Sequence, residues 1–244
     1  MKQSATLTFF ALVAVTCSCA QSPATVEPYF ASRAAYVYPR GSATSPDGKK
    51  LASIRVLDDS PDSRTFPSAE VTARTPRGSL RSRIQFGLNA QILWSDDSSA
   101  FAITGSAEGG NGQYQTSAFL IRGGRLVRVP LTRLVERAFG HPVKCGWPEP
   151  PNVEAVKWLK GSTRLLVAAE IIGHTNCDSM GTFKGFVIDL QSAQVVRGYN
   201  QIEVKRLFGA DLAPELRDAN DSCILDPPTC YVSSNHPELK RSSQ

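Results

Sequence analysis

The cysteines have the clearest potential for chemistry in this sequence, because a thiol can form a disulfide, bind a metal ion or act as a nucleophile. Six are present, and four lie beyond residue 20: Cys145, Cys177, Cys223 and Cys230. In an exported chain an even number favours two disulfides, with buried unpaired thiols as the alternative. The sequence has no Cys-x-x-Cys pair, and its three histidines do not flank the cysteines at ligand spacing. We therefore expect no metal site.

Other groups of reactive side chains are interpreted as solvated loops. The glycine-rich stretch 109–112 lacks the Lys-Ser/Thr pair of a phosphate-binding loop. Asp58, Asp59 and Asp62 lack the Gly and the final Glu of a calcium-binding loop. A disulfide at Cys177 would remove the thiolate that His174 could activate. Because common hydrolase motifs such as Gly-x-Ser-x-Gly are also missing, we expect no catalytic residue and no cofactor.

The N-terminus has the pattern of a signal peptide. Lys2 precedes an apolar stretch of about a dozen residues, which is too short to span a bilayer, and small residues lead up to Ala20. We expect cleavage after Ala20 and export to the periplasm or the medium. The alternative is a membrane-anchored lipoprotein with a lipid on Cys17 or Cys19. We expect no membrane span in the rest of the chain.

The remaining 224 residues are enough for one sizeable β domain or two small ones. Loss of Lys2 lowers the net charge from +5 to +4, and no Lys/Arg cluster is present, so we expect no nucleic-acid partner. Arg122, Arg125 or Lys184 could contact an anionic ligand, although isolated surface cations are common.

A short turn recurs three times and precedes an apolar segment each time. Its first copy is Ser45-Pro46-Asp47-Gly48, in which Pro46 sets φ for a type I turn and Gly48 allows a left-handed exit. The other copies keep part of this chemistry and are Trp94-Ser95-Asp96-Asp97-Ser98 and Trp158-Leu159-Lys160-Gly161-Ser162. Separations of 50 and 64 residues suggest a structural repeat.

Each repeat is expected to form four antiparallel strands. The stretch 165–169 is apolar without alternation, which predicts a strand buried on both faces. Sheets packed face to face around an axis provide such burial, so we predict an all-β, propeller-like stack with Trp94 and Trp158 between neighbouring blades. The expected strands are 51–57, 68–74 and 79–86 after a weak opening strand; 89–94, 99–104, 114–121 and 125–129; and 153–158, 163–171, 182–190 and 194–199.

The turn Ser45-Pro46-Asp47-Gly48 and its variant at Trp94 resemble the WD40-like repeat of the TolB type, which is written Trp-Ser-Pro-Asp-Gly before a strand. Thr44 replaces the Trp in the first copy, and the Trp158 copy is a weak match. The resemblance implies a β-propeller, yet propellers close with about four to eight blades and three are clear here. The stretch 29–38 and the C-terminal tail could together supply part of a fourth blade. Otherwise the arc is open, and its exposed end faces favour self-association.

The long connections gather at one end of the expected blades, where we expect any binding surface. This end also holds two helical insertions, Leu131–Phe139 and Gln201–Phe208, each followed by a Gly suited to a C-cap. The topology would place Cys145 beside Cys177, while Cys223 and Cys230 would pin a tail. We divide the mature chain into a propeller-like domain, 21–215, and a C-terminal tail, 216–244.

Two functions remain open at this point. As the TolB-type resemblance implies, the chain is expected to be an exported interaction module that binds a protein or an envelope component. The alternative is a hydrolase that uses carboxylates at the loop-rich end. Ionisable groups with shifted pKa values inside a cleft would favour the enzyme.

Overall fold

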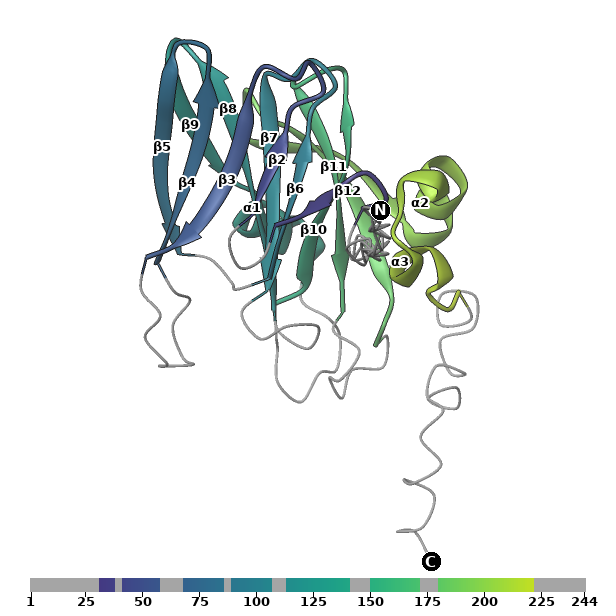
Figure 1. Ribbon diagram of the computed structural model, residues 1–244. Coiled ribbons are helices and arrows are strands. Elements are labelled where there is room, and N and C mark those ends of the chain that lie inside the picture. The colour runs from purple at the N-terminus through teal and green to yellow at the C-terminus, as the bar shows by residue number, and fades with distance from the viewer. Residues whose placement is uncertain are drawn as a thin grey trace, which may run out of the picture.

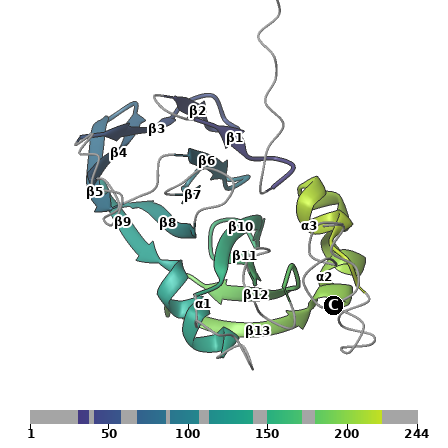
Figure 2. The same ribbon diagram turned by 90° about the horizontal axis from the view of Figure 1, so that it is seen from below.

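Three antiparallel β-sheets stand side by side and form the body of the protein (Figures 1 and 2). The computed structural model describes residues 31–37, 41–57, 68–85, 89–106, 113–140, 150–171 and 180–221. The expected signal peptide, all six cysteines, the residue 58–62 carboxylates, the glycine-rich stretch 109–112 and His174 lie outside these ranges.

The order of the strands within each sheet is that of a meander, apart from β1. The sheets are β2 (Ser42–Thr44), β3 (Leu51–Val56), β4 (Ser68–Thr75) and β5 (Gly78–Gln85); β1 (Ala35–Tyr36), β6 (Asn89–Trp94), β7 (Ala100–Ser106), β8 (Tyr114–Arg122) and β9 (Arg125–Pro130); and β10 (Asn152–Leu159), β11 (Arg164–Glu170), β12 (Phe183–Asp189) and β13 (Gln194–Asn200). The predicted all-β, propeller-like fold with three blades is confirmed.

The N-terminal stretch adds a strand to the second blade. Ala35 pairs with Ile92, and Tyr36 pairs with Gln91. The free edge of β6 accepts this segment because β6 is the first strand of its own meander and is otherwise paired only with β7. The described residues contain three sheets and no part of a fourth.

The middle strands of the second and third blades are buried on both faces. In β11, Leu165 and Val167 pack toward the second blade, whereas Leu166 and Ala168 pack on the opposite side. All four are fully buried, as the lack of alternation in this strand predicted. An antiparallel sheet often has one solvent-exposed face, but this one is covered by other elements on both faces.

The first blade behaves differently because it has a neighbour on one side only. In β4, Ala69, Val71 and Ala73 are buried against the second blade, and the residues between them are partly exposed. Glu70 lies on the outer face and forms ion pairs with Arg55 and Arg81. Among the described residues, this outer face of the first blade thus carries ion-paired side chains, and self-association stays a prediction.

The outer face of the third blade is covered by the C-terminal helices (Figure 2). These are α2 (Gln201–Phe208), the short 3-10 helix η2 (Gly209–Asp211) and α3 (Pro214–Asp218). Val204, Leu212 and Leu216 pack on the face that carries Leu166 and Ala168. Residue 215, where we placed the end of the repeat domain, lies inside α3, and Leu216 packs on the third blade. The division into a domain and a tail stays a prediction.

The helices α1 (Leu131–Phe139) and α2 have the bounds that the sequence predicted. In the first turn of each helix, a side chain accepts a hydrogen bond from the backbone of a strand. Thr132 accepts a hydrogen bond from the backbone N–H of Thr116 at 2.8 Å, and Gln201 accepts one from that of Phe183 at 3.0 Å. Gly140 has the left-handed φ of 79° that suits a C-cap. The expectation was wrong for Gly209, whose φ of −54° is right-handed because the chain continues into η2.

Candidate functional site

The repeated turns lie together at the end of the blades with short connections. Gly48 has a φ of 70°, and its N–H donates to the carbonyl of Ser45 at 2.8 Å, as expected for the turn that Pro46 opens. The Ser45 hydroxyl donates to Asp47 at 2.6 Å, and the Asp47 carboxylate accepts from the Lys49 N–H at 3.0 Å. The hydrogen bond from Ser45 is the main reason that the pKa of Asp47 is lowered.

The second copy repeats this network. Ser95 donates to Asp97 at 2.7 Å, and Asp97 accepts from the Ser99 N–H at 3.0 Å. Burial alone would raise the pKa of Asp97, but the hydrogen bonds from Ser95 and Ser99 lower it overall. The third copy differs, since both Lys160 and Gly161 have positive φ.

These turns also connect the blades to one another. The Asp47 N–H donates to the Ser98 hydroxyl at 3.0 Å, and the Ser99 hydroxyl donates to that of Ser162 at 2.6 Å. The turn residues therefore have partners within the protein and serve the packing of the blades.

The two repeat tryptophans lie between neighbouring blades, in the place expected for them. Trp94 donates its indole N–H to the carbonyl of Ala43 at 2.9 Å, and Trp158 does the same to Leu93 at 2.9 Å. Each bond joins the first strand of one blade to that of the preceding blade. Because both indoles are buried, these acceptors satisfy a donor that would otherwise be costly to desolvate.

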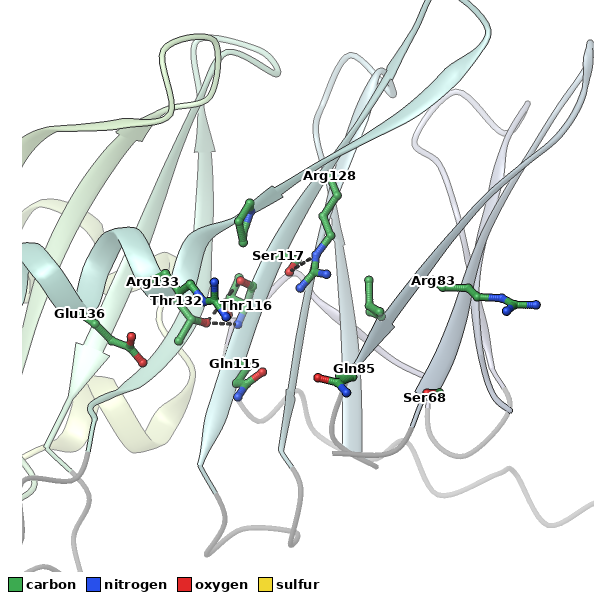
Figure 3. A pocket seen from close by; sticks show the side chains of 12 residues that line it. Ser68, Arg83, Gln85, Gln115, Thr116, Ser117, Arg128, Thr132, Arg133 and Glu136 are labelled. Carbon is green, nitrogen blue, oxygen red and sulfur yellow. Dashed lines mark hydrogen bonds between the residues drawn. The ribbon is translucent and has the colours of Figure 1, made fainter. Parts of the chain in front are cut away.

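A groove of about 610 Å³ opens at the opposite, loop-rich end, between the first two blades (Figure 3). It is lined by the last residues of β5, the start of β8, the end of β9 and the first turns of α1. Ile84 forms an apolar wall, and Gln85, Gln115 and Ser117 contribute polar groups. The groove lies at the end of the blades where we expected a binding surface.

Three arginines and one carboxylate line the groove: Arg83, Arg128, Arg133 and Glu136. Arg128 donates from Nε to the Ser117 hydroxyl at 3.1 Å. Desolvation lowers the pKa of Arg128, and the charge of Arg133 lowers it further. Figure 3 shows Arg128 extending toward Ser117, whereas Arg83 points away. Within the described part of the chain, none of these arginines forms an ion pair within 4.0 Å.

The N-terminus of α1 opens onto the same groove. Pro130 is its N-cap and provides no side-chain hydrogen bond, and the first turn has no acidic residue. By contrast, α2 begins with a capping box formed by Asn200 and Glu203. Backbone N–H groups at a helix N-terminus favour negative charge, so this end of α1 adds to the positive character of the groove.

A second group of ionisable residues lies under α3. Glu154 and Glu170 lie diagonally across β10 and β11 on the face that α3 covers, because Glu154 pairs with Ala168 and Glu170 with Asn152. Among the described residues, Oε2 of Glu154 has no hydrogen-bond partner, and the residue is 1% exposed.

The pKa values of these carboxyls are raised. Burial raises that of Glu154 well above its ordinary range, and the charges of Glu170 and Glu215 raise it further. Burial also raises the pKa of Glu170 to about 7, while a hydrogen bond from Asn152 opposes the shift. Glu170 can therefore gain or lose a proton near neutral pH. The cluster shares no residue with the groove.

The sequence did not single out Arg128, Glu154 or Glu170. Charged side chains on a helix face, such as Arg133 and Glu136, are usually just solvated, so the sequence gives no signal for them. Arg122 and Arg125, which we had considered as anion contacts, lie at the β8–β9 hairpin at the other end of the blade. Lys184 lies over the ring of Phe139, with Nζ 4.9 Å from its centroid.

Glu154 could have been noticed as a charge inside an otherwise apolar strand segment.

Among the residues that the structure describes, no group of three or more His, Cys, Asp or Glu side chains is arranged to hold a metal ion. In the same part of the chain, no helix is long and apolar enough to cross a membrane.

Comparisons with known proteins add little to this picture. The sequence matches no protein-family model, and the search of curated proteins gives no match. Among solved structures, the chain is similar to acylaminoacyl peptidase from Pyrococcus horikoshii in its orthorhombic crystal form, with 12% identity and a TM-score of 0.38. The match covers 66% of this chain and 24% of that one. A likeness of this degree carries no argument about activity.

Proposed function

We propose that this protein is an exported interaction module with TolB-like repeats, and that its loop-rich end binds a protein or an envelope component. The observation that supports the proposal most is the groove between the first two blades, because it combines an apolar wall at Ile84 with arginines that form no ion pair with any described residue. Binding sites on scaffold folds gather where loops and strand ends converge, and this groove lies at such a place.

Capture from an envelope extract tests this proposal. The mature, oxidised protein serves as bait, and bound components are identified by mass spectrometry. In Gln85→Trp, a bulky side chain replaces an exposed groove residue at one end of β5. In the control Ser79→Trp, the same side chain is placed on the same face at the other end of β5, outside the groove.

We expect wild type and Ser79→Trp to retain the same component and Gln85→Trp to lose it. Equal capture by all three proteins, or no component above background, would contradict the proposal.

The carboxylate cluster under α3 supports the hydrolase as a second candidate. Glu170 has a pKa near 7, which suits a general acid or base, and Glu154 lies beside it. A hydrolytic activity abolished by Glu170→Gln and unchanged by the exposed substitution Asp218→Asn would support the enzyme. Activity that persists in Glu170→Gln would remove this candidate.

A further inference from the structure

We propose that the groove between the first two blades is an oxyanion site, in which Arg128 and Arg133 bind a carboxylate or phosphate group at the N-terminus of α1. This inference names the ligand chemistry of the groove and therefore rests on the proposed function.

The first argument is the placement of two like charges. Arg128 and Arg133 come from different elements, β9 and α1, and both line the same groove. Their like charges repel, which adds to the lowering of the Arg128 pKa by desolvation. A protein usually places a carboxylate between such a pair. Here the described residues form no ion pair with either arginine, so an anion from solution would relieve the repulsion.

The second argument is that Glu136, the carboxylate that lines the groove, does not neutralise the two arginines. Glu136 lies one turn after Arg133 on α1, and burial raises its pKa while Arg133 lowers it by a smaller amount. No ion pair within 4.0 Å joins Glu136 to Arg128 or to Arg133. With respect to the described residues, both guanidinium groups therefore keep N–H donors available for a ligand, apart from the Nε of Arg128 that donates to Ser117.

The third argument is the set of neutral donors around the arginines. The first turn of α1 has no side-chain cap, and the amide groups of Gln85 and Gln115 line the same space. Thr132 does not cap the helix because its hydroxyl accepts from the Thr116 N–H. Guanidinium groups, helix N–H groups and amides together form the donor set that oxyanions prefer.

Isothermal titration of the full mature protein tests the site. Inorganic phosphate is one probe and succinate the other, with ionic strength held constant by sodium chloride. The variants are Arg128→Gln and Arg133→Gln, and the control is Arg125→Gln, which removes the same charge from β9 outside the groove. Circular dichroism and urea unfolding check that each variant is folded.

We expect at least one probe to bind wild type and Arg125→Gln saturably with one site. Loss of a charge-assisted hydrogen bond in Arg128→Gln or Arg133→Gln should weaken binding about tenfold or more. Binding of phosphate alone would assign a phosphate-bearing ligand, and binding of succinate alone a carboxylate.

Lack of saturable binding to the wild type, or equal weakening by Arg125→Gln, would overturn the inference. If Gln85→Trp abolished capture while neither probe bound, the proposed interaction module would stand without this ligand chemistry.

Discussion

At the scale of single residues, the buried indoles of Trp94 and Trp158 determine how the blades meet. Each reaches a backbone carbonyl of the preceding blade, so that a side chain supplies hydrogen bonding between sheets that share no ladder. The sequence indicated where these residues lie, because each Trp precedes a recurring turn. It could not indicate their partners, which are 51 and 65 residues away.

Replacement of Trp158 by Phe removes the indole donor and leaves the buried carbonyl of Leu93 without this partner. We expect the free energy of unfolding to fall by about 1–3 kcal/mol, measured by urea unfolding. The exposed edge substitution Val196→Ala should change it by less than about 0.5 kcal/mol. Equal stability of Trp158→Phe and wild type would show that the bond does not hold the blades together.

The carboxyl of Glu170 makes stability depend on pH. Its pKa rises from an ordinary 4.5 to about 7 in the folded protein, so the folded state binds the proton more tightly than the unfolded chain. The contribution of this group is therefore fully present below pH 4.5 and is lost as pH rises through about 7.

We expect Glu170→Gln to flatten this dependence, so that the variant gains stability relative to wild type between pH 4.5 and pH 8, by about 1–3 kcal/mol. Urea unfolding at both pH values measures the difference. A constant difference between variant and wild type would contradict the raised pKa.

At the scale of elements, the long strands and both helical insertions were predictable because their apolar patterns and turn residues are local signals. The short strand β1 was not, since two residues carry no periodicity and Ala35 and Tyr36 pair with a strand more than fifty residues away. The helix α3 was missed for a similar reason: its five residues contain one buried side chain, Leu216.

The packing of α2 on the third blade depends on the close approach of Val204 in α2 to Gly185 in β12. A Cβ on Gly185 would lie 2.5 Å from Cγ2 of Val204, so Gly185→Ala forces the helix and sheet apart. We expect a loss of about 1–3 kcal/mol in the free energy of unfolding, partly restored in the double variant with Val204→Ala.

Gly198→Ala provides the matched control for this prediction. Gly198 also lies in a strand of the third blade, but an added Cβ would meet Phe186 at an ordinary 3.8 Å. Similar losses in the two glycine variants would contradict the packing of α2 described here.

At the scale of the whole molecule, the arc ends in two different ways. The first blade presents charged side chains such as Arg55, Glu70 and Arg81, and the third is covered by α2 and α3. The sequence predicted the stack of blades but not these ends, because which face of a strand is covered depends on contacts distant in the chain. The groove likewise forms only when β5 lies beside β9 and α1, so single residues could not reveal it.

Hydrogen exchange followed by mass spectrometry tests the central claim, that three blades pack face to face with helices over the last. The strands β7 and β11 should exchange slowest, because both of their faces are buried, and β5 should exchange much faster as an exposed edge strand. Peptides covering α2 should also be protected. Exchange of β11 as fast as that of β5 would contradict the packing on which this account rests.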